Sequence, residues 1–156
     1  VTKGATTMWE RWNGIKPDGS FQDPSMNSFN HYAYGAIGEW MYANLMGLKV
    51  NENFPGYKRY NIQPLFDKNF DFVEGSFDSN YGKIQISWTR KNGKLRLSID
   101  LPANTSSDVV LNKPMEGSWK LDNSKLESKI LSQRDDKEKT TLFLGSGKYN
   151  FSFVAN

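Results

Sequence analysis

The dipeptide Asn92-Gly93 stands between two runs of alternating apolar and polar residues, and this pattern limits the possible folds more than any other part of the sequence. Asn-Gly is the strongest short signal for a two-residue β-hairpin, because both residues tolerate the positive φ angles that such a turn needs. Apolar residues occupy every second position on both sides of the turn: Ile84, Ile86, Trp88, Leu95, Leu97, Ile99 and Leu101. We therefore predict an antiparallel hairpin with one buried face.

Strand signals continue from this hairpin to the end of the sequence. Short β-like runs with turn residues between them lie at residues 57–62, 109–111, 117–121, 126–131, 140–144 and 149–154. Their spacing predicts an antiparallel β-sandwich over residues 57–156, with the charged run at residues 133–139 as a solvated hairpin tip. Trp88 and Trp119 could bind carbohydrate or pack in the core, and the phase that Trp88 shares with Ile84 and Ile86 favours the core.

The first 48 residues predict a different kind of structure. Residues 13–25 are rich in turn-forming residues and predict a loop. A helix is predicted to follow, with Asn27 or Ser28 as its cap, Met46 near its end and Gly47 as its stop signal. Apolar and small residues surround much of this helix, so we expect it to need helical neighbours and, without them, to self-associate through residues 28–46. Residues 49–56, which contain a turn, are interpreted as a linker to the sandwich.

A lone carboxylate, Glu10, lies between Trp9 and Trp12, and the only histidine of the sequence is His31. Aromatic rings can cover the C–H faces of a pyranose, while carboxylate and imidazole groups can hydrogen-bond its hydroxyls. These four residues are therefore candidates for a sugar site. In the other interpretation the tryptophans pack in a core, Glu10 is a surface charge and His31 is a structural residue.

Charge and composition argue against several other kinds of site. The net charge of +3 is spread along the sequence without a basic stripe, so nucleic acid is not an expected partner despite a pI near 9.0. No apolar run is long enough to span a membrane, and no membrane partner is expected. With one histidine and no cysteine, the sequence predicts neither a zinc site nor another cofactor.

Four sequence runs resemble the C-terminal end of bacterial α-L-rhamnosidases, a family of glycoside hydrolases. The runs are GATTMWERW, PDGS, MNSFNHYAYGAIGEWMY and PGYKRYNIQP, and they agree in order and spacing over residues 4–64. The resemblance implies that residues 1–48 are the last part of an (α/α)6 barrel and that a C-terminal β-sandwich follows. The expected fold class is therefore mostly β, with a loop and one long helix before the sandwich. The family's general acid lies upstream in the barrel, so the sequence is expected to be a fragment.

The resemblance also implies roles for single residues. Glu10 matches the family's general base and His31 matches a histidine that contacts the sugar, with Trp9 and Trp12 beside them. Apart from the resemblance, burial against the two tryptophans would raise the pKa of Glu10 and the charge of Arg11 would oppose that change, and the sequence leaves the balance open. The implied activity of the parent enzyme is hydrolysis, with inversion, of terminal α-L-rhamnosyl residues in a rhamnose-containing carbohydrate, in the periplasm or outside the cell. The fragment alone is expected to be inactive. Two alternatives are a stand-alone carbohydrate-binding sandwich and another (α/α)6 glycosidase or lyase.

Overall fold

The computed structural model describes residues 4–122 and 130–155. They form two compact units: the N-terminal unit reaches to Trp40, and the sheet unit begins at Met41. The N-terminal unit contains the predicted site residues, and the sheet unit contains the hydrophobic core. Within the described ranges, no helix is both long and apolar enough to cross a membrane.

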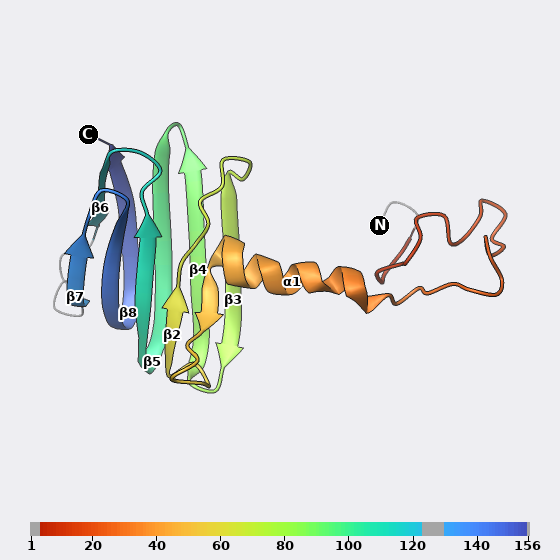
Figure 1. The fold of residues 1–156 in the computed structure, drawn as a ribbon, viewed down its shortest axis with the longest axis horizontal. Helices are drawn as coiled ribbons and strands as arrows, with labels where there is room; N and C mark the ends of the chain where they lie inside the picture. The colour runs from red at the N-terminus through yellow and green to blue at the C-terminus, as the bar shows by residue number, and fades with distance from the viewer. Residues whose placement is uncertain (1–3, 123–129, 156) are drawn as a thin grey trace. The chain divides into compact units, whose positions relative to one another are not determined.

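The strands of the sheet unit hydrogen-bond into one continuous sheet (Figure 1). They are β1 (Leu48–Val50), β2 (Arg59–Ile62), β3 (Phe72–Ser79), β4 (Gly82–Lys91), β5 (Lys94–Asn112), β6 (Gly117–Leu121), β7 (Ile130–Asp135) and β8 (Lys139–Ala155). Among these described strands, β2 runs parallel to β5, and the other pairs are antiparallel. The predicted class, mostly β with an antiparallel sandwich, is confirmed.

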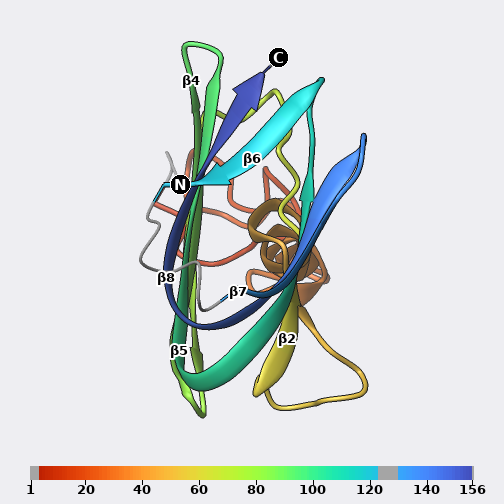
Figure 2. The ribbon, with the colours of Figure 1, turned by 90° about the vertical axis from the view of Figure 1, so that its left-hand side faces the viewer.

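Two long strands, β5 and β8, carry the sheet from one layer of the sandwich into the other (Figure 2). One layer contains the pairing of residues 95–101 of β5 with residues 147–153 of β8, and it continues through β4 and β3 on one side and β6 on the other. The other layer contains the pairing of residues 106–112 of β5 with residues 139–145 of β8, and it continues through β2 and β1 on one side and β7 on the other. The register between β5 and β8 shifts between Leu101 and Ser106, where Asn104 has a φ of 61°. Such a β-bulge bends a strand and increases its twist, so the sheet can fold over on itself here.

The core lies between the two layers and is formed by the alternating apolar residues that the sequence indicates. Those on the central hairpin are all buried: Ile84, Ile86, Trp88, Leu95, Leu97, Ile99 and Leu101. They meet in register, because Ile86 pairs with Ile99 and Trp88 pairs with Leu97. The predicted hairpin turn is also confirmed, since Asn92 and Gly93 have φ angles of 51° and 72°.

Strand β3 is absent from the sequence prediction, because Glu74, Gly75 and Asp78 give this segment a low β-propensity. The glycine has a packing reason: a Cβ at Gly75 would lie 2.7 Å from the sulfur of Met46. Strand β1 is also absent from the prediction, and it occupies the start of the expected linker.

The later strands are longer than the sequence indicates. Residues 109–111 are the end of β5, and the two strands predicted at residues 140–144 and 149–154 are both part of β8. The charged hairpin tip is confirmed, but it is shorter than residues 133–139, because β7 extends to Asp135 and β8 begins at Lys139. Of the strand predicted at residues 126–131, the part before Ile130 lies outside the described residues.

The helical segment begins at Tyr32, later than predicted. The N-terminal unit ends with a 3-10 turn, η1 (Tyr32–Gly35), and α1 (Ala36–Trp40), and the sheet unit begins with a π-helical turn, η2 (Met41–Met46). His31 is the N-cap residue and makes no side-chain cap hydrogen bond. The predicted cap at Asn27 or Ser28 is therefore wrong, and the amide of Asn27 instead donates to the carbonyl of Asp23. Gly47 ends the helix as predicted, with a φ of 82°.

Candidate active site

Two segments of the N-terminal unit run beside each other, and one contains Glu10 while the other contains His31. The N–H of Glu10 donates to the carbonyl of Ser28 at 2.9 Å, and the N–H of His31 donates to the carbonyl of Met8 at 2.7 Å. The hydroxyl of Thr7 also donates to the carbonyl of Phe29. Residues 7–10 are thus fixed against residues 28–31, which are distant in the sequence.

Glu10 is half-buried and its main chain is held from a second direction. The hydroxyl of Tyr34 donates to the carbonyl of Glu10 at 3.4 Å. The guanidinium of Arg11 points elsewhere, because it donates to Gln22 Oε1 at 3.2 Å and lies 3.8 Å from a carboxylate oxygen of Asp23. Arg11 therefore ties down the following loop.

His31 is also half-buried and lies just before the first helical turn rather than in it. Its extended backbone, with φ −86° and ψ 93°, lets the chain pass from the paired segment into η1. The imidazole ring packs near the phenol ring of Tyr34, with ring centroids 5.5 Å apart. Tyr34 therefore contacts both predicted polar residues of the site.

The two tryptophans beside Glu10 have different environments. Trp9 packs edge-on against Phe29, with ring centroids 5.0 Å apart, and Phe29 also packs against Phe21 at 5.7 Å. Gly14 lies close to this small cluster, because a Cβ there would be 3.1 Å from the ring of Phe29 and would press on it. The indole of Trp12 is 98% exposed. The core interpretation therefore fails for Trp12, whose two ring faces are open to a ligand.

The loop that follows Trp12 is shaped by two turns in which an aspartate accepts hydrogen bonds from a serine. The Ser20 hydroxyl and N–H donate to Asp18 at 2.7 and 3.0 Å, and those of Ser25 donate to Asp23 at 2.7 and 2.9 Å. The hydrogen bond from each serine hydroxyl is the main cause that lowers the pKa of the two carboxyls. Both aspartates thus favour the ionised form.

The sheet unit does not offer its tryptophans to a ligand. Trp88 is 1% exposed and its indole N–H donates to the carbonyl of Leu45 at 3.0 Å. Trp119 is 6% exposed and donates to the carbonyl of Asn112 at 3.3 Å. The core interpretation of both residues is confirmed. Within the described ranges, no three His, Cys, Asp or Glu side chains come together in a way that could hold a metal ion.

Sequence reasoning did not single out Tyr34 or Phe29 as part of the site. Their signal in the sequence is the density of aromatic residues around His31, which is compatible with a helix face. In the structure, Tyr34 contacts Glu10 and His31, while Phe29 packs against the ring of Trp9.

Two family models match this chain. The model of the bacterial alpha-L-rhamnosidase 6 hairpin glycosidase domain matches residues 1–45, and the model of the bacterial alpha-L-rhamnosidase C-terminal domain matches residues 47–126. An α-L-rhamnosidase of Streptomyces avermitilis is 44% identical over 109 residues, which are 70% of this chain and 10% of that protein. An α-L-rhamnosidase of Formosa agariphila is 34% identical over 153 residues, which are 97% of this chain and 16% of that protein.

Solved structures of α-L-rhamnosidases are similar to nearly the whole chain. The Streptomyces avermitilis α-L-rhamnosidase, crystallised in complex with L-rhamnose, aligns with a TM-score of 0.72 and 35% identity over 97% of this chain and 14% of its own. The α-L-rhamnosidase of Dictyoglumus thermophilum aligns with a TM-score of 0.75 and 25% identity, over 97% of this chain and 16% of its own. The chain thus spans about a tenth to a sixth of these relatives, and it belongs to the bacterial α-L-rhamnosidase family.

Proposed function

We propose that this chain is the C-terminal part of an α-L-rhamnosidase and that Glu10 is the general base of the whole enzyme. The observation that supports the proposal is the backbone pairing of residues 7–10, which include Glu10, with residues 28–31, which include His31, inside the segment that matches a glycosidase domain. The proposed substrate is a glycoside or polysaccharide with a terminal α-L-rhamnosyl residue.

In the proposed reaction the Glu10 carboxylate accepts a proton from a water molecule as the water oxygen attacks the anomeric carbon. The bond from that carbon to the glycosidic oxygen breaks, and a general acid protonates the leaving oxygen. A single displacement of this kind inverts the anomeric configuration. It needs the acid and the base on opposite sides of the sugar, with their carboxyl groups roughly 6.5–9.5 Å apart to leave room for the water.

We propose that the general acid belongs to a part of the enzyme outside these 156 residues. A general acid must keep its proton near neutral pH, which requires a raised pKa. In the N-terminal unit, hydrogen bonds from Ser20 and Ser25 lower the pKa of Asp18 and Asp23 instead. Glu39 lies on α1 with an exposed side chain, outside the paired segments that include Glu10.

The sugar contacts follow from the exposure of the neighbouring rings. Trp12 offers an open indole face, against which the apolar side of a pyranose can stack. Trp9 is steadied by Phe29 and can form a less mobile wall of the site. His31 can exchange hydrogen bonds with sugar hydroxyls through its ring nitrogens. These three residues are the proposed substrate-binding groups.

We also propose that the chain divides by function near residue 48. Residues 1–48 would belong to the catalytic domain, residues 49–56 would connect the domains, and residues 57–156 would form the C-terminal sandwich. The two family models support this division, since one ends at residue 45 and the other begins at residue 47.

The test is Glu10→Gln in the full-length enzyme, with a nitrophenyl α-L-rhamnoside as substrate. The substitution keeps the shape of the side chain and removes the base, so kcat is expected to fall by about 10²–10⁴-fold. Glu39→Gln is the matched control and should retain wild-type kcat. Proton NMR of the first product formed reads the stereochemistry, and inversion predicts β-L-rhamnose from an α-rhamnoside. Near-normal turnover by Glu10→Gln would remove Glu10 from the mechanism, and an α product would remove the single displacement.

A further inference from the structure

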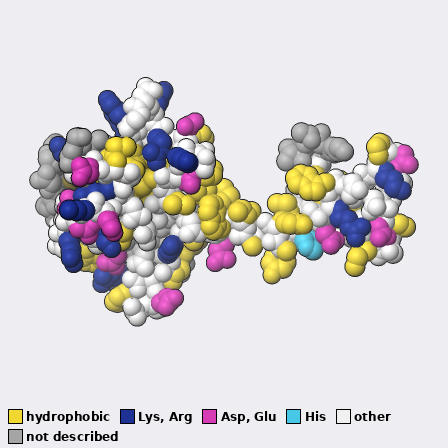
Figure 3. All heavy atoms as spheres, turned by 45° about the horizontal axis from the view of Figure 1, so that its top comes forward, with side chains coloured by type: hydrophobic (Ala, Val, Ile, Leu, Met, Phe, Trp, Pro, Cys, Tyr) yellow, Lys and Arg dark blue, Asp and Glu magenta, His cyan; other side chains and the backbone are white. Residues whose placement is uncertain are grey.

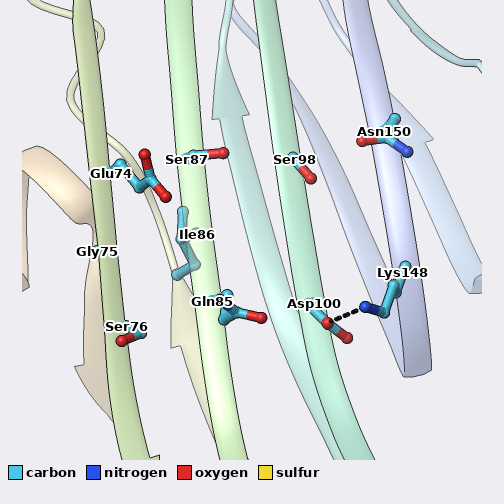
Figure 4. A pocket seen from close by; sticks show the side chains of 10 residues that line it. All are labelled: Glu74, Gly75, Ser76, Gln85, Ile86, Ser87, Ser98, Asp100, Lys148 and Asn150. Carbon is cyan, nitrogen blue, oxygen red and sulfur yellow. Dashed lines mark ion pairs between the residues drawn. The ribbon is translucent and has the colours of Figure 1, made fainter.

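The outer face of the sheet carries a hollow of about 460 Å³ that lies entirely within the sheet unit (Figure 4). Its polar side chains come from the solvent-facing phase of four neighbouring strands, β3, β4, β5 and β8. Glu74, Ser87, Ser98 and Asn150 form one row across these strands, because each is the register partner of the next. The two serines are short, and the longer side chains at both ends of the row form the walls of the hollow.

The side chains of this row are free to bind a ligand. In the described part of the chain, the side chains of Glu74, Ser87, Ser98 and Asn150 make no hydrogen bond or ion pair with another protein group. Together they offer hydroxyl, amide and carboxylate groups, which are both donors and acceptors. Most solvent-facing sheet surfaces are polar, but a hollow row of unengaged groups on four adjacent strands is a more specific feature.

The charge of the hollow favours a neutral ligand. In the neighbouring row, Lys148 is neutralised by Asp100, whose carboxylate lies 2.9 Å from the ammonium group (Figure 4). The remaining charge of the hollow is the carboxylate of Glu74. Arg96 and Asp122 line the adjoining hollow, and because their charges are opposite the excess of one carboxylate remains, so a phosphate, a sulfate or an acidic glycan would meet a groove of net negative charge.

An aromatic side chain stands on the same face, one row further along. Phe72 is two residues before Glu74 on β3, so it shares the outward phase, and its backbone is about 7 Å away at the rise of a β-strand. Its ring is 68% exposed. A pyranose that hydrogen-bonds to the polar row could place an apolar C–H face against this ring.

A second hollow of about 300 Å³ continues the first along the strands, because Ser87, Ser98 and Asn150 line both. Thr89 and Arg96 extend the lining toward the level of Phe72, with which they share a register row. The combined groove is therefore longer than the single row.

We propose that this groove is a carbohydrate-binding site for a neutral oligosaccharide, distinct from the Glu10 site. Its hydrogen-bonding row selects hydroxyls, its charge disfavours anions, and Phe72 supplies the stacking surface. The choice of a rhamnoside as the first probe rests on the proposed function, but the groove itself does not. A site of this kind would hold a polysaccharide near the enzyme without taking part in the reaction.

The experiment follows the amide NMR shifts of the 15N-labelled 156-residue chain during titration with methyl α-L-rhamnoside, methyl β-D-galactoside and a methyl glucuronide. We expect saturable shifts around Ser87, Ser98 and Asn150 with at least one neutral glycoside, with a Kd of about 1–10 mM, as is usual for a small ligand on an open surface. The glucuronide should bind more weakly, because it carries a carboxylate. Shifts around Glu10 and His31 would report on the proposed active site, so the two proposals can fail separately.

Ser98→Ile tests the groove directly, because it fills the centre of the row with a strand-compatible side chain that cannot hydrogen-bond. It should weaken binding at least about tenfold. Ser118→Ile on β6 is the matched control, since Ser118 lies outside both hollows and should leave the Kd unchanged. Phe72→Ala is an independent test and should weaken binding about two- to tenfold. The proposal is overturned if neither neutral glycoside shifts the groove amides, if the glucuronide binds best, or if folded Ser98→Ile and Phe72→Ala bind as wild type does.

Discussion

The two units of this chain use their hydrophobic residues in opposite ways. In the sheet unit, large side chains such as Trp88, Tyr60 and Tyr149 are fully buried between the layers. In the described part of the N-terminal unit, the one residue that is fully buried is Gly14. Its large apolar side chains are exposed to different degrees, and they include Met8, Trp12, Phe21, Met26, Tyr32, Tyr34, Ile37 and Trp40. Figure 3 also shows many hydrophobic side chains at the surface of the molecule.

This difference indicates that the sheet unit can fold by itself, whereas the N-terminal unit depends on protein neighbours to cover its apolar side chains. The sheet unit, residues 41–156, has a contiguous core and the size of an ordinary domain, which is sufficient for independent folding. The N-terminal unit is held by backbone hydrogen bonds and serine–aspartate turns, and many of its large apolar side chains are exposed. We therefore expect substitutions to act on stability in one unit and on binding or activity in the other.

The largest effect is expected for Trp88→Ala, compared with Trp12→Ala. Truncation of Trp88 leaves a cavity in the core and removes the donor to the carbonyl of Leu45, so the free energy of unfolding should fall by about 3–5 kcal/mol. Trp12→Ala should change it by no more than about 0.5 kcal/mol, because the indole is exposed. Urea unfolding followed by circular dichroism measures both. Equal losses would show that the N-terminal unit contains a core of its own.

The next effect is a loss of stability at alkaline pH that originates in the sheet unit. Burial raises the pKa of Tyr60 to about 12, from an ordinary value near 10. Below pH 10 the phenol is protonated in both states, whereas between pH 10 and 12 it ionises only in the unfolded state. Stability should therefore fall over this window, by about 2–3 kcal/mol from Tyr60. Burial also raises the pKa of Tyr57 and Tyr149, in the same direction.

Unfolding midpoints in urea at a series of pH values check this prediction. Tyr60→Phe should reduce the alkaline loss, and Tyr32→Phe, at an exposed position of the N-terminal unit, should leave it as in wild type. If Tyr60→Phe loses stability with pH as steeply as the wild type, the buried phenol is not the cause.

A smaller effect is expected for His31→Ala in the full-length enzyme. If His31 contacts the sugar, the substitution leaves a polar contact unmade, so KM should rise and kcat/KM should fall. The fall in kcat/KM should correspond to a loss of about 1–3 kcal/mol of transition-state stabilisation. The melting temperature should change little, since His31 makes no side-chain cap to the helix. Unchanged kinetics with a lower melting temperature would make His31 a structural residue of the N-terminal unit.

The smallest effect concerns self-association of the 156-residue chain. We expect a dimer or larger species at high concentration, held by the exposed aromatic side chains of the helical segment, among them Trp40 and Tyr42. Trp40→Ser should weaken this association about tenfold. Val154→Ser, at an exposed apolar position of the sheet unit, is the control and should leave the association unchanged. Light scattering measures the state, and a chain that stays monomeric when concentrated would contradict this view of the helix.

The sequence predicts best where periodicity is strict and the turn chemistry is specific. The β4–β5 hairpin follows from the alternation around Asn92-Gly93, and the end of the helix follows from Gly47. β3 does not follow, because it is a strand through its backbone pairing with β4 rather than through its own composition. The parallel pairing of β2 with β5 depends on where distant strands meet, which local patterns do not contain.

In the candidate site, too, the sequence does not predict which distant segments meet. The types of its residues could be named from the sequence, but their partners could not, because those are set by the loop path. Arg11 is adjacent to Glu10 in sequence and yet pairs with Asp23 across the loop. The helix start moved from Ser28 to Tyr32 because residues 28–31 hydrogen-bond to residues 7–10 instead of beginning a helical turn.

The passage of β5 and β8 through both layers has a consequence for the order of folding. Strand β8 pairs with β5, β6 and β7, and its residue Phe153 is opposite Leu95. Neither layer is complete before this late strand has been added, so a nascent chain would expose the apolar faces of β4 and β5 until residues near 153 leave the ribosome. Contacts this distant in sequence favour folding in milliseconds to seconds rather than microseconds. Stopped-flow fluorescence of the buried Trp88 would follow that final closure.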